Sequence, residues 1–373
     1  MKIFVFGSSI TSSYWNGAAT YYRGIYRNLH RLGYDITFAE PDIYARRQHC
    51  DVQHPDYVGV RVYQTPDDLR QVLKETRGAD LVIKHSGVGA DDELLEAEVL
   101  QLRSPQMRVA FWDVDAPATL ARVEANSADP FRALVPQYDF IFTYGGGPPV
   151  VDHYLRLGAR NCTPIYNGLD PDTHYPVSSD PRVSCDLAFI GHRLPDREER
   201  VRSFFFRASE LAPELSFILG GEGWGNCAMP PNVRWIGHVG CTDHNRINCS
   251  ARMVLNINRE SMARVGFSPP TRVFEAAGAG ACVITDAWAG IEQFFQPDEE
   301  ILVARSAEEI VAYLRSISSR AAADIGKGMR RRAQRDHTYQ QRATLFDQVM
   351  RSSAARVNRL GTELSALPLP SAA

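Results

Sequence analysis

The sequence predicts a two-domain α/β protein in which each domain is built on its own doubly wound, Rossmann-like parallel sheet. Three observations predict this. The chain has 373 residues, which suits two domains of roughly 150–200 residues. Short apolar runs alternate with segments of helical period in both halves, as in strands joined by crossover helices. The segment at 167–176, between the halves, is rich in Asn, Gly, Asp and Pro, which favour neither a helix nor a strand. We therefore expect domains at 1–170 and 171–337.

In the first half, the apolar run at 3–6 predicts a strand. The segment at 18–32 predicts a helix, because apolar residues recur every three or four positions and Gly33 follows at the expected C-cap. The elements expected after it are a strand at 36–40, a helix at 69–76 and strands at 80–84, 108–112, 140–144 and 161–165.

The second half repeats the alternation. A helix is expected at 270–279, because Pro stands at its start and Gly280 follows it. The other expected elements are strands at 186–190, 216–219, 232–236, 253–257, 282–285 and 301–304, helices at 196–211 and 307–316, and an Arg-rich helical tail at 321–357.

Composition disfavours several classes of protein. The net charge of −3 makes a nucleic-acid partner unlikely. No apolar run approaches the roughly 18 residues of a membrane span, and the apolar start is too short for a signal peptide. The seven cysteines are odd in number and scattered, which favours a reduced, cytoplasmic protein.

The architecture predicts a ligand site between the domains. In open parallel sheets, ligands bind beyond the carboxyl ends of the strands, and helix N-termini there can hold a diphosphate. The first glycine turn, at 7–11, lacks the Gly-x-Gly-x-x-Gly spacing of a dinucleotide fold, and no Gly-Lys-Ser/Thr occurs. A dehydrogenase and a P-loop ATPase are therefore disfavoured.

Two motifs carry a family resemblance. Asn-Gly-Leu-Asp-Pro at 167–171 and Arg-Val-Phe-Glu-Ala-Ala-Gly-Ala-Gly at 272–280 resemble nucleotide-sugar-dependent glycosyltransferases of the GT-B fold. The chain is most similar to the CgeB-like (spore maturation) group, which resembles the retaining GT4 enzymes. The likeness runs from residue 1 to about residue 350 and includes 7–13, 113–117, 256–259, 268–272 and 284–290.

The resemblance implies an enzyme that moves a sugar from a nucleoside diphosphate, UDP- or GDP-linked, to a hydroxyl of a small molecule, glycan or protein. It implies retention of configuration, no cofactor and no metal. It also implies a C-terminal helix at 338–360 that packs back on the N-terminal domain, before a disordered tail at 361–373.

Donor binding is expected on the C-terminal domain. Glu275 matches the family's carboxylate that accepts hydrogen bonds from both ribose hydroxyls. The diphosphate gains charge as the glycosidic bond breaks and needs cationic partners, for which Arg193 and Arg259 are the first candidates. The other expected donor-side residues are Gly191, His238, Ser268, Thr271 and Arg272.

One departure from the family pattern concerns the donor sugar. GT4 enzymes carry a second glutamate eight residues before the first, but position 267 here is Phe. Backbone N–H groups of 266–268 are the expected substitutes. The sugar specificity of the GT4 enzymes therefore does not carry over.

Catalytic candidates lie in the N-terminal domain. Asp113 and Asp115 follow a strand, and one of them would be the general base if the enzyme inverts configuration; loop capping is the alternative. If it retains configuration, the leaving phosphate can take the acceptor proton. His85 follows another strand and is expected to face the cleft. The acceptor-side residues expected are Ser9, Thr11, Gly17 and Gly146.

Several alternatives stay open. His238, Cys241, His244 and Cys249 have the chemistry of zinc ligands but fit no common finger spacing. The missing glutamate favours a binding or scaffold protein of the same fold without turnover. A nucleotide-sugar epimerase would need an acid/base pair beside the donor sugar, and no such pair is evident in the sequence. A DNA-modifying glycosyltransferase is disfavoured by the negative net charge. The oligomeric state is not predicted.

Overall fold

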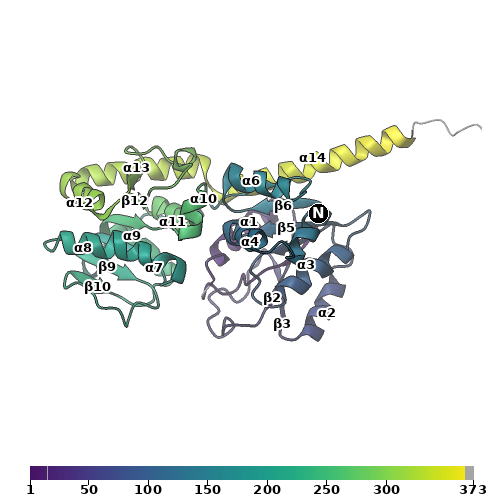
Figure 1. The fold of residues 1–373 in the computed structure, drawn as a ribbon, viewed down its shortest axis with the longest axis horizontal. Coiled ribbons are helices and arrows are strands. Elements are labelled where there is room, and N and C mark those ends of the chain that lie inside the picture. The colour runs from purple at the N-terminus through teal and green to yellow at the C-terminus, as the bar shows by residue number, and fades with distance from the viewer. Residues whose placement is uncertain (15, 366–373) are drawn as a thin grey trace, which may run out of the picture.

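The structure, a computed structural model, describes residues 1–14 and 16–365, with the side chains of 241–242 and 354–365 left aside. Two parallel sheets form the centres of two domains (Figure 1). The first sheet has the strand order β3-β2-β1-β4-β5-β6-β7, and the second has the order β10-β9-β8-β11-β12-β13. The order reverses beside the first strand of each sheet, which is the point where doubly wound folds place their ligands.

The first domain contains the following elements: β1 Lys2–Phe6, α1 Ala19–Arg31, β2 Asp35–Pro41, β3 Gly59–Tyr63, α2 Pro66–Glu75, β4 Leu81–His85, α3 Asp92–Gln101, β5 Arg108–Asp113, α4 Ala116–Ala125, α5 Pro130–Leu134, η1 Val135–Gln137, β6 Phe140–Thr143, α6 Gly147–Arg156 and β7 Thr163–Pro164.

The second domain contains η2 Pro181–Val183, β8 Cys185–Ile190, α7 Pro195–Val201, η3 Arg202–Phe206, α8 Arg207–Leu211, β9 Phe217–Gly220, β10 Val233–Trp235, α9 Cys241–Ser250, β11 Ala251–Asn256, α10 Glu260–Val265, α11 Thr271–Ala279, β12 Val283–Asp286, η4 Ile291–Gln293, β13 Leu302–Ala304, α12 Ala307–Ser316 and α13 Ser319–Asp336. Helix α14, Tyr339–Ser365, follows.

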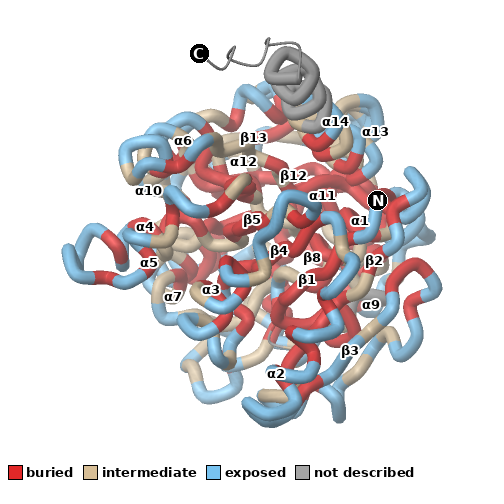
Figure 2. Tube along the Cα trace, turned by 90° about the vertical axis from the view of Figure 1, so that its right-hand side faces the viewer, coloured by how far each residue is buried: buried red, intermediate tan, exposed pale blue. Residues whose placement is uncertain are grey.

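The central strands are buried on both faces, because helices cover both sides of each sheet. Strands β4 and β12 are buried along their whole length. Figure 2 shows the same arrangement, with the strands of the interior in red and the outer helices and loops in pale blue. Apolar runs without alternation therefore mark the strands of both sheets. No described helix is long and apolar enough to cross a bilayer.

Helix α14 returns to the first domain, where it packs beside α1 (Figure 1). Tyr339 and Phe346 are fully buried in the apolar cluster that contains α1. The Tyr339 ring lies so close to Gly24 that a Cβ there would meet it at 2.2 Å. The chain crosses between the domains near Leu169 and Thr338, which form a parallel bridge. The two segments that cross between the domains are therefore hydrogen-bonded to each other at this bridge.

Several elements differ from the sequence expectations. Strand β3 was missed because it is a half-exposed edge strand. Helices α3 to α6 were missed because they are short, at 5 to 10 residues, which is too few for a clear helical period. The single helix expected at 196–211 contains a π-helical turn, η3. The helical tail expected at 321–357 consists of two helices, α13 and α14, and the second of them begins where the helix at 338–360 was expected. Residues 361–365 are helical and not part of a disordered tail, and 366–373 lie outside the described residues.

Candidate active site between the domains

A cavity of about 480 Å³ lies between the domains and is lined by residues of both. Its volume is within the usual range for a small-molecule site. The first domain contributes the loop after β1 and the ends of β4 to β6. The second contributes the loop after β8, the start of α9, the end of β11 and the start of α11. These are carboxyl ends of strands and N-termini of helices, as expected for a parallel fold.

Two arginines converge on the second domain's side. A Cβ on Gly191 would lie 2.9 Å from Arg272 Nη2 and 3.0 Å from Arg197 Nη2. Both guanidinium groups stack over the Phe189 ring, with Cζ at 5.3 Å for Arg272 and 5.7 Å for Arg197. Glycine at 191 therefore leaves the space in which the two cations face the cavity.

The two arginines are fixed by backbone and amide oxygens. Arg272 donates to the Ile190 carbonyl and, at 3.0 Å, to Asn256 Oδ1, while Arg197 donates to the His192 carbonyl. Neither forms an ion pair with a described carboxylate within 4.0 Å. Burial, together with the nearby charge of Arg272, lowers the pKa of Arg197 to about 9. One buried and one half-buried cation, neither with a carboxylate within ion-pair distance, make a site for a dianion such as a diphosphate.

Glu275 lies on α11 beside the same cavity. Its Oε2 is 3.3 Å from His244 Nδ1. Burial alone raises the pKa of this carboxyl, but the hydrogen bond with His244 and the nearby His174, His244 and Arg272 lower it to about 2. Glu275 is therefore a carboxylate at any physiological pH, able to accept hydrogen bonds from two hydroxyls of a ligand.

Within the described side chains, His174, His244 and Glu275 form a cluster with metal-ligand chemistry. Their ligand atoms all lie within 4.8 Å of one another, and His174 Nε2 is buried without a partner. Two imidazoles and one carboxylate would suit zinc. The zinc hypothesis from the sequence used a different set. In the structure His238 lies near Glu222 and Cys249 Sγ contacts backbone groups, while the Cys241 side chain is outside the described part.

The loop at position 267 joins the domains. Gly146 N donates to the Phe267 carbonyl at 2.8 Å, and Phe267 has a left-handed φ of 49°. A Cβ on Gly147 or Gly290 would collide with the Phe267 ring. The backbone N–H groups of 266 and 267 already donate to Met262 and Ala289. These two groups are therefore occupied and do not replace the missing glutamate.

An ion pair spans the cavity between the domains. Arg259 Nη1 is 2.6 Å from Asp115 Oδ2, and Arg259 Nε is 2.7 Å from Asp196 Oδ2. Burial raises the pKa of the Asp115 carboxyl, although Arg259 opposes this rise. Burial also lowers the pKa of Arg259, but the two carboxylates outweigh it and leave that pKa above its ordinary value. Arg259 is therefore already neutralised, unlike Arg197 and Arg272.

Two proposed catalytic residues lie in the protein interior instead of the cavity. His85 is 0% exposed and its Nε2 shares a 2.6 Å hydrogen bond with the Tyr26 hydroxyl. Burial lowers the pKa of His85 to about 3. Asp113 accepts hydrogen bonds from Ser86, Thr119 and Tyr154. Strand alternation turns both side chains inward, so neither can contact a ligand in the cavity in this arrangement.

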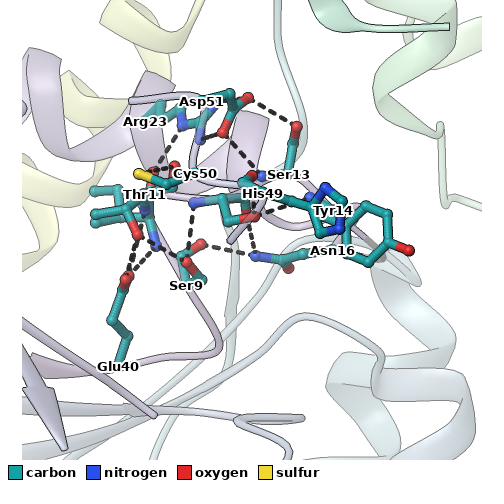
Figure 3. A network of polar contacts seen from close by, with 12 residues as sticks. Ser9, Thr11, Ser13, Tyr14, Asn16, Arg23, Glu40, His49, Cys50 and Asp51 are labelled. Carbon is teal, nitrogen blue, oxygen red and sulfur yellow. Dashed lines mark hydrogen bonds and ion pairs between the residues drawn. The ribbon is translucent and has the colours of Figure 1, made fainter. Parts of the chain in front are cut away.

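The loop after β1 is held by buried polar contacts (Figure 3). Glu40 accepts hydrogen bonds from Ile10 N at 2.6 Å, Thr11 N at 3.3 Å and the Thr11 hydroxyl. Ser9 Oγ lies 3.3 Å from Thr11 Oγ1 and accepts from Ser12 N. Ser9 and Thr11 therefore shape this loop and do not line the cavity.

The expected site residues divide into two groups. Those that line the cavity are Gly17, Asp115, Gly191, His238, Arg259, Thr271, Arg272 and Glu275. Those that do not are Ser9, Thr11, His85, Asp113, Gly146, Arg193 and Ser268. Arg193 instead forms a two-bonded ion pair with Glu198.

Sequence reasoning missed Arg197 and His244 as partners of the proposed donor site. Arg197 lies four residues after Arg193 in the first turn of α7, which was a usable signal. Which of the two arginines faces the cavity depends on the direction of the loop after β8. The sequence does not show that direction.

Comparisons with known proteins agree with this fold. Residues 197–348 match the family model described as "Glycosyl transferase-like". A sucrose-phosphate synthase from Thermosynechococcus elongatus matches with 14% identity over 95% of this chain and 100% of that chain, at a TM-score of 0.66. Anabaena Alr3699/HepE in complex with UDP-glucose matches with 14% identity over 94% and 100%, also at 0.66. A comparison with curated proteins gives no match.

An alpha-glucosyltransferase in complex with UDP-glucose and DNA containing an abasic site is also similar. It has 13% identity over 91% of this chain and 96% of that chain, at a TM-score of 0.64. Identities this low show the fold alone. The chain therefore has the GT-B fold: two parallel-sheet α/β domains that face a cleft.

Proposed function

We propose that the protein is a glycosyltransferase that moves a sugar from a nucleoside-diphosphate sugar to an acceptor hydroxyl. The observation that carries the proposal is the convergence of Arg197 and Arg272 at Gly191, beside the ionised Glu275. The arginines suit the diphosphate, and the carboxylate suits the ribose hydroxyls. Solved structures of the same fold carry UDP or UDP-glucose, which makes UDP the first nucleotide to test.

We expect transfer with retention of configuration. The carboxylates that line the described cavity are Asp115 and Glu275, and both are engaged, by Arg259 and His244. No described carboxylate in the cavity is thus unpaired and placed to act as a general base. The departing phosphate, held by Arg197 and Arg272, can take the acceptor proton on the face from which it leaves.

The same two guanidinium groups provide two positive charges, so we expect the transfer to need no resident metal. The cluster of His174, His244 and Glu275 makes this expectation testable. Treatment with EDTA should leave the dissociation constant of UDP unchanged. A loss of UDP binding that Zn²⁺ restores would assign the cluster to a metal instead.

A second candidate function follows from Phe267. Where the resembling enzymes carry a carboxylate, this side chain packs against Gly147 and Gly290. A protein that binds a nucleotide sugar without turnover is therefore the alternative. It predicts nucleotide binding with no release of sugar. On the motifs given above, we also propose a cytoplasmic protein related to the CgeB-like group.

The first experiment is a calorimetric titration with UDP, GDP, TDP and ADP, repeated with Glu275→Gln. Glutamine keeps one carbonyl acceptor, so the variant loses one charge-assisted hydrogen bond to the ribose, which costs roughly 1.5–3 kcal/mol, or about 10- to 150-fold in the dissociation constant. The control is Glu292→Gln, at an exposed glutamate of the same domain. The nucleotide that binds then selects the donor sugars for a transfer assay.

The outcomes separate the hypotheses. Binding of one nucleotide that weakens only in Glu275→Gln supports the donor site, and sugar release supports the transferase. Binding without sugar release across the matching donors favours the silent binding protein. No nucleotide binding by the folded protein refutes the donor site.

A further inference from the structure

Another buried arginine lies on the opposite side of the cavity. Arg46 comes from the loop between β2 and β3 of the first domain and is only 7% exposed. It lines the cavity together with Ser8, Gly17 and Gly87. In the proposed function the donor is held by Arg197, Arg272 and Glu275 of the second domain, which leaves the first domain, and with it Arg46, on the acceptor side.

Arg46 is a cation with unused hydrogen-bond donors. Nη1 donates to the Ser8 carbonyl at 2.9 Å, and Cζ lies 5.3 Å from the centre of the Tyr44 ring. Nε is buried without a partner, and no described carboxylate lies within ion-pair distance. The negative charge of Glu40 acts on Arg46 from a distance, but the Glu40 carboxylate accepts hydrogen bonds from the backbone N–H groups of residues 10 and 11. A buried arginine left this way is costly unless a ligand supplies the anion.

The loop holds Arg46 in this inward position. Tyr44 and Ala45 both have a left-handed backbone, with φ of 55° and 57°, which is unfavourable for residues other than glycine. Space is open nearby, since a Cβ on Gly17 or Gly87 would meet no atom within 4 Å. The loop therefore directs a guanidinium towards a cavity with room for a ligand group.

We propose that Arg46 is the anion-binding group of the acceptor subsite, and that the acceptor carries a phosphate ester or a carboxylate near the hydroxyl that receives the sugar. A guanidinium forms paired hydrogen bonds with either group. This inference rests on the proposed function, because that function makes the first domain the acceptor side. It adds to it the chemical class of the acceptor.

The test measures anion binding while UDP fills the donor site. Inorganic phosphate is titrated into the UDP-saturated wild type, Arg46→Met and Arg47→Met. Arg47 is the matched control, because it is the next residue of the same loop and is exposed. Since one charge-assisted fork is lost, phosphate binding should weaken about 10-fold or more in Arg46→Met. Arg47→Met should bind phosphate like the wild type, and all three proteins should bind UDP alike.

A second arm identifies the anion. Glucose 6-phosphate, glucuronate and glucose are titrated under the same conditions. Tighter binding of glucose 6-phosphate assigns the subsite to a phosphate ester, and tighter binding of glucuronate assigns it to a carboxylate. Both should lose affinity in Arg46→Met. Equal binding of neutral glucose would overturn the proposal.

Other results would also overturn it. Unchanged phosphate affinity in Arg46→Met refutes the subsite. A loss of UDP affinity as large as the loss of phosphate affinity assigns Arg46 to the donor. If Arg46→Met does not fold, Arg46→Lys decides, because it keeps the charge but loses the fork and should weaken phosphate binding to a smaller extent. Failure of UDP to bind the wild type refutes the proposed function, while the comparison of variants with phosphate in the free protein still decides the role of Arg46.

Discussion

Replacing Arg197 with methionine should stabilise the free protein and weaken nucleotide binding. The pKa of the Arg197 guanidinium is about 9. Against ~12.5 for an exposed arginine, this corresponds to a cost of roughly 5 kcal/mol for holding the charge in the folded protein at neutral pH. Methionine keeps much of the apolar stem and fills irregular space, but it carries no charge. The free energy of unfolding should therefore rise.

Part of that gain is offset by lost contacts. Methionine removes the hydrogen bond to the His192 carbonyl and the stacking on Phe189, each worth about 1 kcal/mol. A net gain of about 1–3 kcal/mol follows, which for a domain of this size raises the unfolding temperature by roughly 2–4 °C per kcal/mol. UDP should bind about 10- to 150-fold more weakly, because one charge-assisted contact to the diphosphate is lost.

The assay combines thermal unfolding without nucleotide and calorimetric titration with UDP. The matched control is Arg193→Met. Arg193 pairs with Glu198 outside the cavity, so this variant should keep the UDP affinity and change stability by less than ~1 kcal/mol. A lower unfolding temperature in Arg197→Met would show that the contacts of Arg197 outweigh the cost of holding its charge in the folded protein. Unchanged UDP affinity would show that Arg197 does not contact the diphosphate.

Three further predictions concern acid stability, domain contact and the glycine between the arginines. His85 stays neutral in the fold with a pKa of about 3, while the unfolded chain takes up the proton below about pH 6.5, so the free energy of unfolding decreases as pH falls towards 3. In urea unfolding, His85→Phe should remove roughly 2 kcal/mol of the stability that the wild type loses between pH 7 and pH 5. An equal loss in both proteins would contradict this. Asp115→Asn breaks the ion pair with Arg259 between the domains. The substitution should lower the free energy of unfolding by less than ~1 kcal/mol, yet increase the radius of gyration measured by X-ray scattering without UDP. An unchanged radius would show that the pair does not hold the domains together. Gly191→Ala places a methyl group within about 3 Å of both guanidinium groups. The variant should bind UDP about 10-fold more weakly without any change of charge. Wild-type affinity would mean that the two arginines are not confined at this position.

The fold class and most strands are predictable from local patterns. Strand β4 and strand β12 read as apolar runs because helices bury both of their faces, and this needs no knowledge of neighbours. Helix α11 is equally legible, with Pro270 before it and Gly280 at its left-handed C-cap. The motif around Glu275 was likewise found from the sequence. Local rules reach this far because each feature depends on residues close in the chain.

The direction in which a side chain points could not be predicted from the sequence. His85 and Lys84 are neighbours on one strand, yet each points into a different buried environment, and the sequence does not say which face meets the cavity. The same holds for Arg193 and Arg197, four residues apart, of which only Arg197 lines it. Arg259 was predicted as a free cation for the diphosphate. Asp115, which neutralises it, lies 144 residues away in the chain.

The sequence by itself thus determined the two parallel-sheet α/β units, because hydrophobic period and capping residues act over a few positions. The proposed ribose carboxylate, Glu275, came from the resemblance of its motif to a known family. Only the tertiary structure decided which charges are paired and which remain free. Among the described arginines, Arg46 and Arg197 are the buried ones, and neither has a carboxylate within ion-pair distance; Arg272 is half-buried and also lacks such a carboxylate. That property is set by contacts between segments far apart in the chain, and no local pattern records it.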